Sequence, residues 1–353
     1  MHKLSLCVIF GGKSSEHEVS RVSAASVIKN LDMEKYHLHM IGITKGGRWL
    51  YYSGPVEKVP TGEWESDIQN LDPAIISPDS GDKGILLFKG GAVEKIKPDA
   101  VFPVLHGKNG EDGTIQGLLA LAGIPCVGSG VIGSGVCMDK CVAKVLFEKH
   151  NIPTAEWVEL KCSQMPDIEM IEKKLGYPCF VKPANAGSSV GVTKAADRAG
   201  LTEGIKAAFV HDYKILIEKG INAREVECSV MGNLEPEAAS VIGEIVPANE
   251  FYDYDAKYND ENSRLYIPAK VDDATREKIR GYAVRAYAAC ECRGLARVDF
   301  LVDKTTGAVF LNEINTIPGF TSISMYPKLW EASGLSYAKL IDRLIELAME
   351  ECV

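Results

Sequence analysis

Four polar residues on two apolar runs have the types and spacing of a metal site. Arg297 and Asp299 stand two positions apart in one run, and Glu313 and Asn315 stand two positions apart in the next. The turn-like segment 303–307 predicts an antiparallel hairpin in which each pair shares one face. If Asp299 pairs with Glu313, their carboxylates repel unless a divalent cation lies between them, and an all-oxygen set suits magnesium. The alternative is a hairpin with one solvated polar face.

Two lysines and a glycine-serine turn have the composition of a polyphosphate site. Lys140 begins a predicted helix, and Lys182 lies in an apolar run shortly before the segment Gly187-Ser-Ser-Val-Gly191. Lysine supplies positive charge and glycine-rich backbone supplies N–H donors, which together neutralise phosphate oxygens. An isolated lysine is usually only solvated, but the apolar neighbours of Lys182 favour a binding function.

Three further polar residues follow predicted strands directly. Glu16 follows the first apolar run, and His106 and Glu111 follow a later one. Open α/β sheets bind ligands at the carboxyl ends of their parallel strands. A single acidic residue at a helix start often only complements the helix dipole, so the shared position of the three is what favours function.

The elements that must position these residues begin with a predicted parallel α/β unit. Apolar runs at 4–10, 37–44 and 100–105 predict strands, and the pattern at 18–31 predicts a helix. Strands that alternate with helices specify a parallel sheet. Residues 45–95 are rich in Gly, Pro, Asp and Lys, and we interpret them as an elaboration of loops and short strands.

Two further units are expected, because 353 residues exceed the usual size of one core. We predict an N-terminal open parallel α/β unit at 1–128, a central unit at 129–220 and a C-terminal unit at 221–353. The last two are predicted to be α+β, and the C-terminal unit carries a polar lid loop at 249–265. Their predicted helices span 140–149, 200–209, 272–291 and 336–350, and their predicted strands span 214–218 and 224–231.

Two nucleotide-binding motifs are imitated but not satisfied. The segment Gly128-Ser-Gly-Val-Ile-Gly133 fits G-x-G-x-x-G, yet it lies far from the first strand-to-helix turn, where a dinucleotide-binding domain carries it. The segment Gly12-Lys-Ser14 imitates the end of a P-loop, but Cys7 stands where the first glycine is required. A dehydrogenase is therefore a distant alternative, and a P-loop is excluded.

Composition excludes several classes of partner. The net charge of −9 argues against nucleic acid, which requires clustered Lys and Arg. No apolar run reaches the ~20 residues that span a bilayer, and the first residues lack the pattern of a signal peptide, so no membrane partner and a cytoplasmic location are expected. The ten cysteines are scattered among apolar neighbours, which indicates reduced structural thiols.

Together, these motifs resemble the ATP-grasp superfamily and, more closely, the D-alanine–D-alanine ligase family with its D-alanine–D-lactate and D-alanine–D-serine relatives. The resemblance runs from segment 8–20 to segment 315–327 and covers nearly the whole chain. Its most specific motifs between these ends are three segments, 106–117, 138–140 and 251–258. It implies an ATP-grasp fold, in which the two α+β units enclose the nucleotide.

The resemblance also implies the reaction. A ligase of this family uses ATP to join two D-alanines through an acyl phosphate, in the synthesis of peptidoglycan precursors. Its implied cofactors are ATP and two Mg²⁺ ions, or Mn²⁺ in their place, and its implied assembly is a homodimer. The alternatives are a D-serine or D-lactate ligase of the same family, a nicotinamide dehydrogenase, and a non-catalytic nucleotide-binding regulator.

Residue roles follow from the same resemblance. The metal ligands would be Asp299, Glu313 and Asn315. The contacts to ATP would come from Lys140, Lys182, Ser189, Glu218, Lys219, Ile221, Glu225 and Lys257.

The substrate side is implied in the same way. Glu16 would receive the ammonium of the first D-alanine, with His106 and Glu111 nearby. The reacting carbonyl would be polarised by Arg297 and the Gly319 backbone, the carboxylate of the second substrate would bind Ser324, and the lid would be latched by Ser188 and Tyr258 through Glu225.

The second substrate is predicted from two positions. Lactate-using relatives carry a histidine where Tyr258 stands, and an uncharged phenol does not repel an ammonium group in the same way. Serine-using relatives carry an arginine where Met325 stands, whereas methionine offers an apolar wall that suits a methyl side chain. The product is therefore predicted to be D-Ala-D-Ala.

Overall fold

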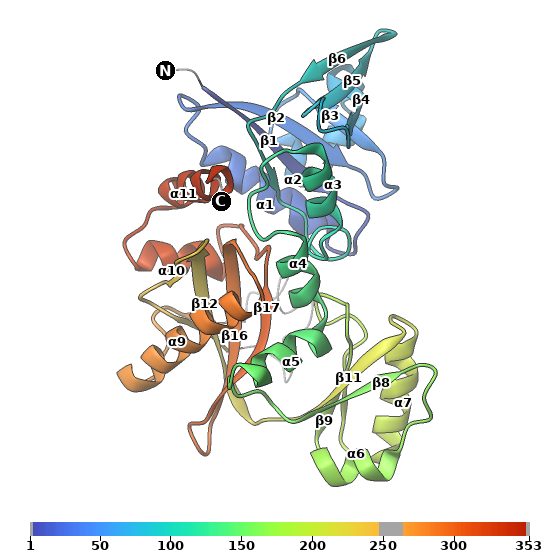
Figure 1. Ribbon diagram of the computed structural model, residues 1–353, viewed down its shortest axis with the longest axis vertical. Coiled ribbons are helices and arrows are strands. Elements are labelled where there is room, and N and C mark those ends of the chain that lie inside the picture. The colour runs from blue at the N-terminus through green and yellow to red at the C-terminus, as the bar shows by residue number, and fades with distance from the viewer. Residues whose placement is uncertain (1–2, 247–263, 351–353) are drawn as a thin grey trace.

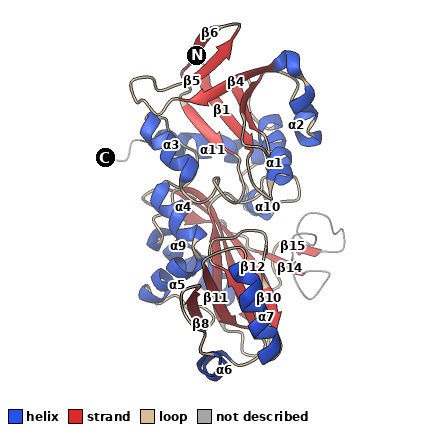
Figure 2. Cartoon of the chain, turned by 90° about the vertical axis from the view of Figure 1, so that its right-hand side faces the viewer, coloured by secondary structure: helices blue, strands red, loops and turns tan. Residues whose placement is uncertain are grey.

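Three β-sheets flanked by helices follow one another along the chain (Figure 1). They are seen in a computed structural model that describes residues 3–246 and 264–350. The first sheet lies at one end of the molecule and the other two lie toward the opposite end (Figure 2). Within these two ranges, no helix is both long and apolar enough to cross a membrane.

The first sheet combines a parallel centre with an antiparallel extension. Strands β1 (Leu4–Gly11), β2 (Tyr36–Ile43) and β7 (Ala100–Pro103) pair in parallel, as predicted, and β1 leads into α1 (His17–Lys29). The predicted elaboration at 45–95 contains strands that extend the sheet from β2 by antiparallel pairing, so the sheet as a whole is mixed. These strands are β3 (Trp49–Tyr52), β4 (Leu71–Ile76), β5 (Ile85–Lys89) and β6 (Ala92–Ile96), with the short helix α2 (Lys58–Thr61) after β3.

Three successive helices connect the first sheet to the second (Figure 1). They are α3 (Thr114–Ala122), α4 (Val131–Met138) and α5 (Lys140–Lys149). Helix α5 begins at Lys140 because the Asp139 side chain accepts hydrogen bonds from the backbone N–H groups of Cys141 and Val142. This cap fixes the position of Lys140 at the helix start.

The second sheet is small and antiparallel. Its order is β10-β9-β11-β8, and a buried aliphatic layer, including Val181 and Ile217, packs beneath its helices. Its strands are β8 (Trp157–Lys161), β9 (Cys179–Pro183), β10 (Thr193–Ala195) and β11 (Lys214–Lys219), and its helices are α6 (Ile168–Leu175) and α7 (Arg198–Phe209).

The third sheet carries the predicted hairpin. Its order is β15-β14-β12-β16-β17, with β13 paired to β12. The strands are β12 (Ala223–Gly232), β13 (Glu237–Ala238), β14 (Gly243–Val246), β15 (Arg264–Tyr266), β16 (Gly294–Asp303) and β17 (Val309–Asn315), and the helices are α9 (Asp273–Ala289), α10 (Met325–Ala332) and α11 (Tyr337–Met349). Strand β15 includes the last two residues of the predicted lid loop, and all the other residues of that loop lie outside the described ranges.

The two ends of the chain share one core. Helices α10 and α11 lie between the first and third sheets (Figure 1), and a buried cluster joins Phe102 of β7 to Phe320, Tyr326 and Leu344. The ring centroids of Phe102 and Phe320 are 5.7 Å apart in an edge-to-face contact. This core holds the loop before α10 against the carboxyl ends of β1 and β7.

Candidate active site

A cleft of about 1690 Å³ is lined by residues of the second and third sheets, of the connecting helices and loops, and of the loops that follow β1 and β7 in the first sheet. Every predicted site residue within the described ranges lines it. The two others, Lys257 and Tyr258, lie outside those ranges. The structure therefore brings together residues that the sequence separates by about 300 positions, such as Glu16 and Ser324.

The predicted hairpin forms one wall of the cleft, in the predicted register. Asp299 pairs with Glu313, and Arg297 pairs with Asn315 across β16 and β17. The guanidinium of Arg297 donates two hydrogen bonds of 2.7 Å to the Asp299 carboxylate, and Asn315 Nδ2 donates to the same carboxylate at 2.9 Å. Arg297, Asp299 and Asn315 thus form one hydrogen-bonded network, and Glu313 lies beside it in the strand register.

Glu227 belongs to this network and was not predicted. Its carboxylate lies 3.1 Å from the Arg297 guanidinium, and strand β12 pairs it with Asp299. The side-chain period of a strand could have identified it, because Glu227 follows the predicted site residue Glu225 by two positions and so lies on the same face. We name Glu227, Arg297, Asp299, Glu313 and Asn315 the acidic cluster.

The acidic cluster fits a divalent cation. Its donors are carboxylate and amide oxygens, which magnesium prefers, and Asp299 lies directly opposite Glu313. In the described part of the chain, no three side chains drawn from His, Cys, Asp and Glu form a metal-binding group, so Asn315 would have to be the third ligand. A magnesium ion usually keeps several waters or phosphate oxygens, and such a small protein contribution is typical of it.

A second cluster of opposite charge lies on another wall. Glu218 of β11 is almost fully buried, and both its oxygens contact lysines: Oε1 contacts Lys182, and Oε2 lies 3.1 Å from Lys144 Nζ. Burial opposes the Glu218 charge, but the two lysines outweigh it and lower the pKa of Glu218 to about 2. We name Lys144, Lys182 and Glu218 the basic cluster.

Lys144 was not predicted as a site residue. It follows Lys140 by four positions on α5, so the helix period puts both on one face and could have identified it. The Lys140 ammonium donates to the Ala186 carbonyl at 2.7 Å and lies 3.8 Å from Glu313. Lys140 thus lies beside the acidic cluster, whereas Lys144 contacts Glu218 within the basic cluster.

Glu16 lies where the first sheet meets the glycine-serine turn. The Ser188 hydroxyl donates a hydrogen bond to Glu16. A Cβ atom at Gly107 or Gly187 would lie 2.5 or 2.9 Å from the Glu16 carboxylate, so both backbones approach it closely, and Gly107 also has a left-handed φ of 72° that favours glycine. Ser188 has a left-handed φ of 48°, which is unusual for serine and holds the turn over Glu16.

His106 and Glu111 are close to Glu16 and differ in protonation. The His106 ring is buried between the Ile317 carbonyl, 3.0 Å from Nδ1, and the Ser23 hydroxyl, 3.1 Å from Nε2. Burial lowers its pKa, so the ring is neutral, with Nδ1 donating to the carbonyl. Loss of solvent and the charge of Glu16 raise the pKa of Glu111 to about 8.

The loop before α10 supplies Gly319 and Ser324, and the first residue of α10 is Met325. A Cβ atom at Gly319 would lie 2.7 Å from the Ser324 hydroxyl, so the two residues are in close contact. The Ser324 hydroxyl accepts a hydrogen bond from the Thr321 backbone N–H at 3.0 Å. Met325 is 4% exposed, and its sulfur packs against Gly243 at the edge of the cleft.

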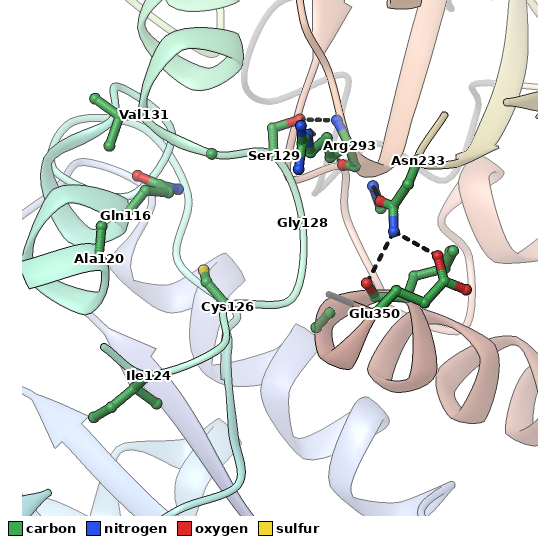
Figure 3. Close-up of a pocket in the computed structure, with 14 residues that line it drawn as sticks. Gln116, Ala120, Ile124, Cys126, Gly128, Ser129, Val131, Asn233, Arg293 and Glu350 are labelled. Carbon is green, nitrogen blue, oxygen red and sulfur yellow. Dashed lines mark hydrogen bonds between the residues drawn. The ribbon is translucent and has the colours of Figure 1, made fainter. Parts of the chain in front are cut away.

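The rejected G-x-G-x-x-G segment lies away from this cleft. Gly128 and Gly130 line a separate cavity of about 230 Å³, together with residues such as Arg293 and Glu350 (Figure 3). A Cβ atom at Gly133 would lie 2.6 Å from the Glu291 carbonyl oxygen, so helix packing explains this glycine. The segment leads into α4 and does not directly follow β1, β2 or β7, the parallel strands of the first sheet.

Comparison with known proteins identifies the family. The model of the D-ala D-ala ligase N-terminus matches residues 5–129, and that of the D-ala D-ala ligase C-terminus matches residues 146–346. The chain belongs to the D-alanine–D-alanine ligase family. The D-alanine–D-alanine ligase of Thermoanaerobacter sp. (strain X514) is 54% identical to this chain, and the match covers 99% of this chain and 98% of the relative. The D-alanine–D-alanine ligase of Acetivibrio thermocellus is 55% identical, and the match covers 99% of this chain and 96% of the relative.

Solved structures of family members have the same fold. The VanG D-Ala:D-Ser ligase from Enterococcus faecalis superposes with a TM-score of 0.90 at 40% identity, over 98% of this chain and 100% of that one. The D-alanine–D-alanine ligase from Coxiella burnetii superposes with a TM-score of 0.86 at 34% identity, over 99% of this chain and 94% of that one. The predicted ATP-grasp fold of the family is confirmed.

Proposed function

We infer that this protein is a ligase that uses ATP to join two D-alanines into D-alanyl-D-alanine, a step in peptidoglycan precursor synthesis. The observation that carries this inference is the single cleft that joins an acidic cluster, a basic cluster and the buried carboxylate of Glu16 in a chain of this family. Each has the chemistry for one participant: a divalent cation, a phosphate and an ammonium group.

The nucleotide would lie between the central and C-terminal units. Lys140, Lys182 and Ser189, with Lys257, would contact its phosphates, and the segment from Glu218 through Lys219 to Ile221 would contact its adenine. Glu225 would contact the ribose. Two magnesium ions, or manganese in their place, would be held by Asp299, Glu313 and Asn315, and when bound they would supply the positive charge that offsets the phosphates.

The chain's own residues would then perform two steps. Glu16 would bind the ammonium of the first D-alanine, so that its carboxylate attacks the γ-phosphate of ATP, ADP leaves, and an acyl phosphate forms. The amine of the second D-alanine, bound through Ser324, would attack the acyl carbon, lose a proton and expel phosphate. Arg297 and the Gly319 N–H would stabilise the tetrahedral oxyanion. Ser188 and Tyr258 would help to close the lid at 249–265 and exclude water.

D-serine ligation is the second candidate function. It is favoured by the TM-score of 0.90 to a D-Ala:D-Ser ligase. D-alanine as the second substrate is favoured by Met325, whose buried apolar side chain has no donor for a substrate hydroxyl. A D-lactate ligase would form an ester in the same site.

The cellular setting follows from this reaction. ATP and amino-acid precursors are cytoplasmic metabolites, so we propose a cytoplasmic enzyme. We also propose units at 1–128, 129–220 and 221–353, of which the first binds substrate and the others enclose ATP, and a homodimer.

Phosphate release tests the proposed function. Purified protein with ATP and magnesium should release phosphate only when D-alanine is added. A dehydrogenase would instead need a nicotinamide cofactor, and a nucleotide-binding regulator would release no phosphate in response to D-alanine. Phosphate release that is independent of D-alanine would contradict the proposal.

A further inference from the structure

Lys144 is a buried cation that does not itself line the cleft. Its side chain is 2% exposed, and its ammonium lies 3.1 Å from Glu218 Oε2. Glu218 Oε1 contacts Lys182, and both Glu218 and Lys182 line the cleft, whereas Lys144 is absent from its lining. Lys144 therefore lies behind Glu218 as seen from the cleft.

The basic cluster holds one more positive charge than it needs. One lysine would neutralise Glu218, yet two contact it, although removing each ammonium group from water costs free energy. The Glu218 charge outweighs the desolvation of Lys182 and raises the pKa of Lys182, so that lysine stays charged. A cluster in which two lysines contact one carboxylate can release one lysine to another anion and keep the carboxylate paired.

We propose that Lys144 is a positioning residue that keeps Glu218 paired when Lys182 turns from it toward a nucleotide phosphate. This inference rests on the proposed role of Lys182 in phosphate binding. Without Lys144, transfer of Lys182 to phosphate would leave the buried Glu218 carboxylate without a cation, and nucleotide binding would have to offset that cost. With Lys144 in place, Glu218 keeps its charge partner in both states.

The proposal differs from a structural role in what it predicts for ligands. A lysine that only attaches α5 to β11 would, when lost, lower stability and weaken every ligand of the cleft alike. A lysine that frees Lys182 for phosphate would affect ligands in proportion to their phosphate charge. Adenosine, which has no phosphate, and a non-hydrolysable ATP analogue with magnesium separate the two roles.

The test is calorimetric titration of the full-length variant Lys144→Met, which keeps a similar side-chain length and removes the charge. We expect about tenfold or greater weakening for the ATP analogue and less than about threefold for adenosine. Lys144→Arg, which retains the charge, should bind the analogue at least about fivefold more tightly than Lys144→Met. The core variant Ile171→Ala in the same unit controls for lost stability and should alter the ratio of the two affinities little.

A second substitution tests the charge argument directly. Adding Glu218→Gln to Lys144→Met removes the carboxylate that would be left unpaired, and it should recover at least about fivefold in analogue affinity relative to adenosine affinity, a ratio in which any change in the adenine contact of Glu218 cancels. Equal weakening of both ligands by Lys144→Met, or no recovery in the double variant, would overturn the proposal. If Lys144→Met does not fold, the double variant is compared with Glu218→Gln alone: similar analogue affinities support the proposal, and tenfold weaker binding by the double variant overturns it.

These outcomes are separate from those of the proposed function. If the wild-type protein releases phosphate with D-alanine but Lys144→Met binds the analogue as the wild type does, only the role of Lys144 is wrong. If the wild-type protein releases no phosphate with D-alanine, the proposed reaction is wrong, and the titrations still report whether Lys144 supports phosphate binding.

Discussion

The acidic cluster lines the same cleft as Lys182 and Glu218 of the basic cluster, and the two clusters have opposite charge balances. The acidic cluster contains three carboxylates and one guanidinium, whereas the basic cluster contains two ammonium groups and one carboxylate. A buried pair with balanced charges says little about function, because desolvation cancels much of its attraction. An unbalanced cluster is different, since its excess charge has the sign opposite to that of a ligand it could bind.

The comparison assigns different ligands to the two walls. Excess negative charge beside Glu313 favours a divalent cation, and excess positive charge beside Lys182 favours phosphate. Lys140 lies 3.8 Å from Glu313 and on the same helix as Lys144, so it stands between the two. A magnesium nucleotide carries both charges and could satisfy both walls at once.

The largest effect is expected for Glu313→Gln, which removes a proposed metal ligand at nearly constant volume. We expect turnover to fall by at least about 100-fold, because charge on the transferred phosphate is no longer offset. The measurement is D-alanine-dependent phosphate release at saturating magnesium, with the melting temperature as a check on folding. The matched control is Glu235→Gln, an exposed carboxylate that should change neither quantity. Near-wild-type turnover of folded Glu313→Gln would contradict the assignment of Glu313 as a metal ligand.

A smaller effect of another kind is expected for Lys182→Met in the basic cluster. We expect the KM for ATP to rise about tenfold to 100-fold, since a charge-assisted contact to phosphate is lost. The KM for D-alanine should change much less. Initial rates at varied ATP and varied D-alanine measure both. An unchanged KM for ATP in Lys182→Met would contradict the assignment of phosphate to the basic cluster.

A pH-dependent effect is expected at Glu111, whose pKa is raised to about 8. The unfolded chain has a glutamate pKa near ~4.3, so the folded state binds this proton more tightly. This contribution to the free energy of unfolding is present below pH ~4 and is lost as pH rises through about 8. The melting temperature of Glu111→Gln minus that of the wild type should therefore be larger at pH 9 than at pH 6. The same difference for Glu235→Gln should not change with pH. Melting temperatures of Glu111→Gln and the wild type that change by the same amount with pH would contradict the assigned pKa.

The smallest effect is expected for Met325→Arg, which adds a donor at the substrate end of the cleft. We expect a several-fold shift of product from D-Ala-D-Ala toward D-Ala-D-Ser. The shift is limited because Met325 is buried against Gly243, so a guanidinium must turn into the cleft to stay hydrated. Product ratios with equal D-alanine and D-serine measure it. An unchanged ratio would show that this position does not set the preference.

The sequence was sufficient to predict the acidic hairpin and the central strands. Alternation with period two fixed the faces of β16 and β17, and the turn between them fixed the pairing of Asp299 with Glu313. The parallel pairing of β1 with β2 and β7 followed from buried strand patterns and the intervening helix. These are local signals that survive folding because tertiary contacts agree with them.

The burial of Lys144 and the pairing of the sheet extension could not be predicted in the same way. Lys144 has the sequence environment of an ordinary helix lysine, and its burial depends on how α5 packs on β11, which local patterns do not specify. Short strands were expected at 45–95, but strands β3 to β6 are brief and Pro73 lies inside β4, so the sequence did not specify their bounds or their pairing. Glu227 was missed although its spacing from Glu225 carried a usable signal.

Product analysis with competing acceptors tests the central claim most directly. Wild-type protein is given ATP, magnesium and equal D-alanine, D-serine and D-lactate, and both phosphate and products are quantified. The account predicts one phosphate per product molecule and D-Ala-D-Ala as the dominant product. Phosphate release without a dipeptide, or a majority of D-Ala-D-Ser or of the depsipeptide, would contradict it.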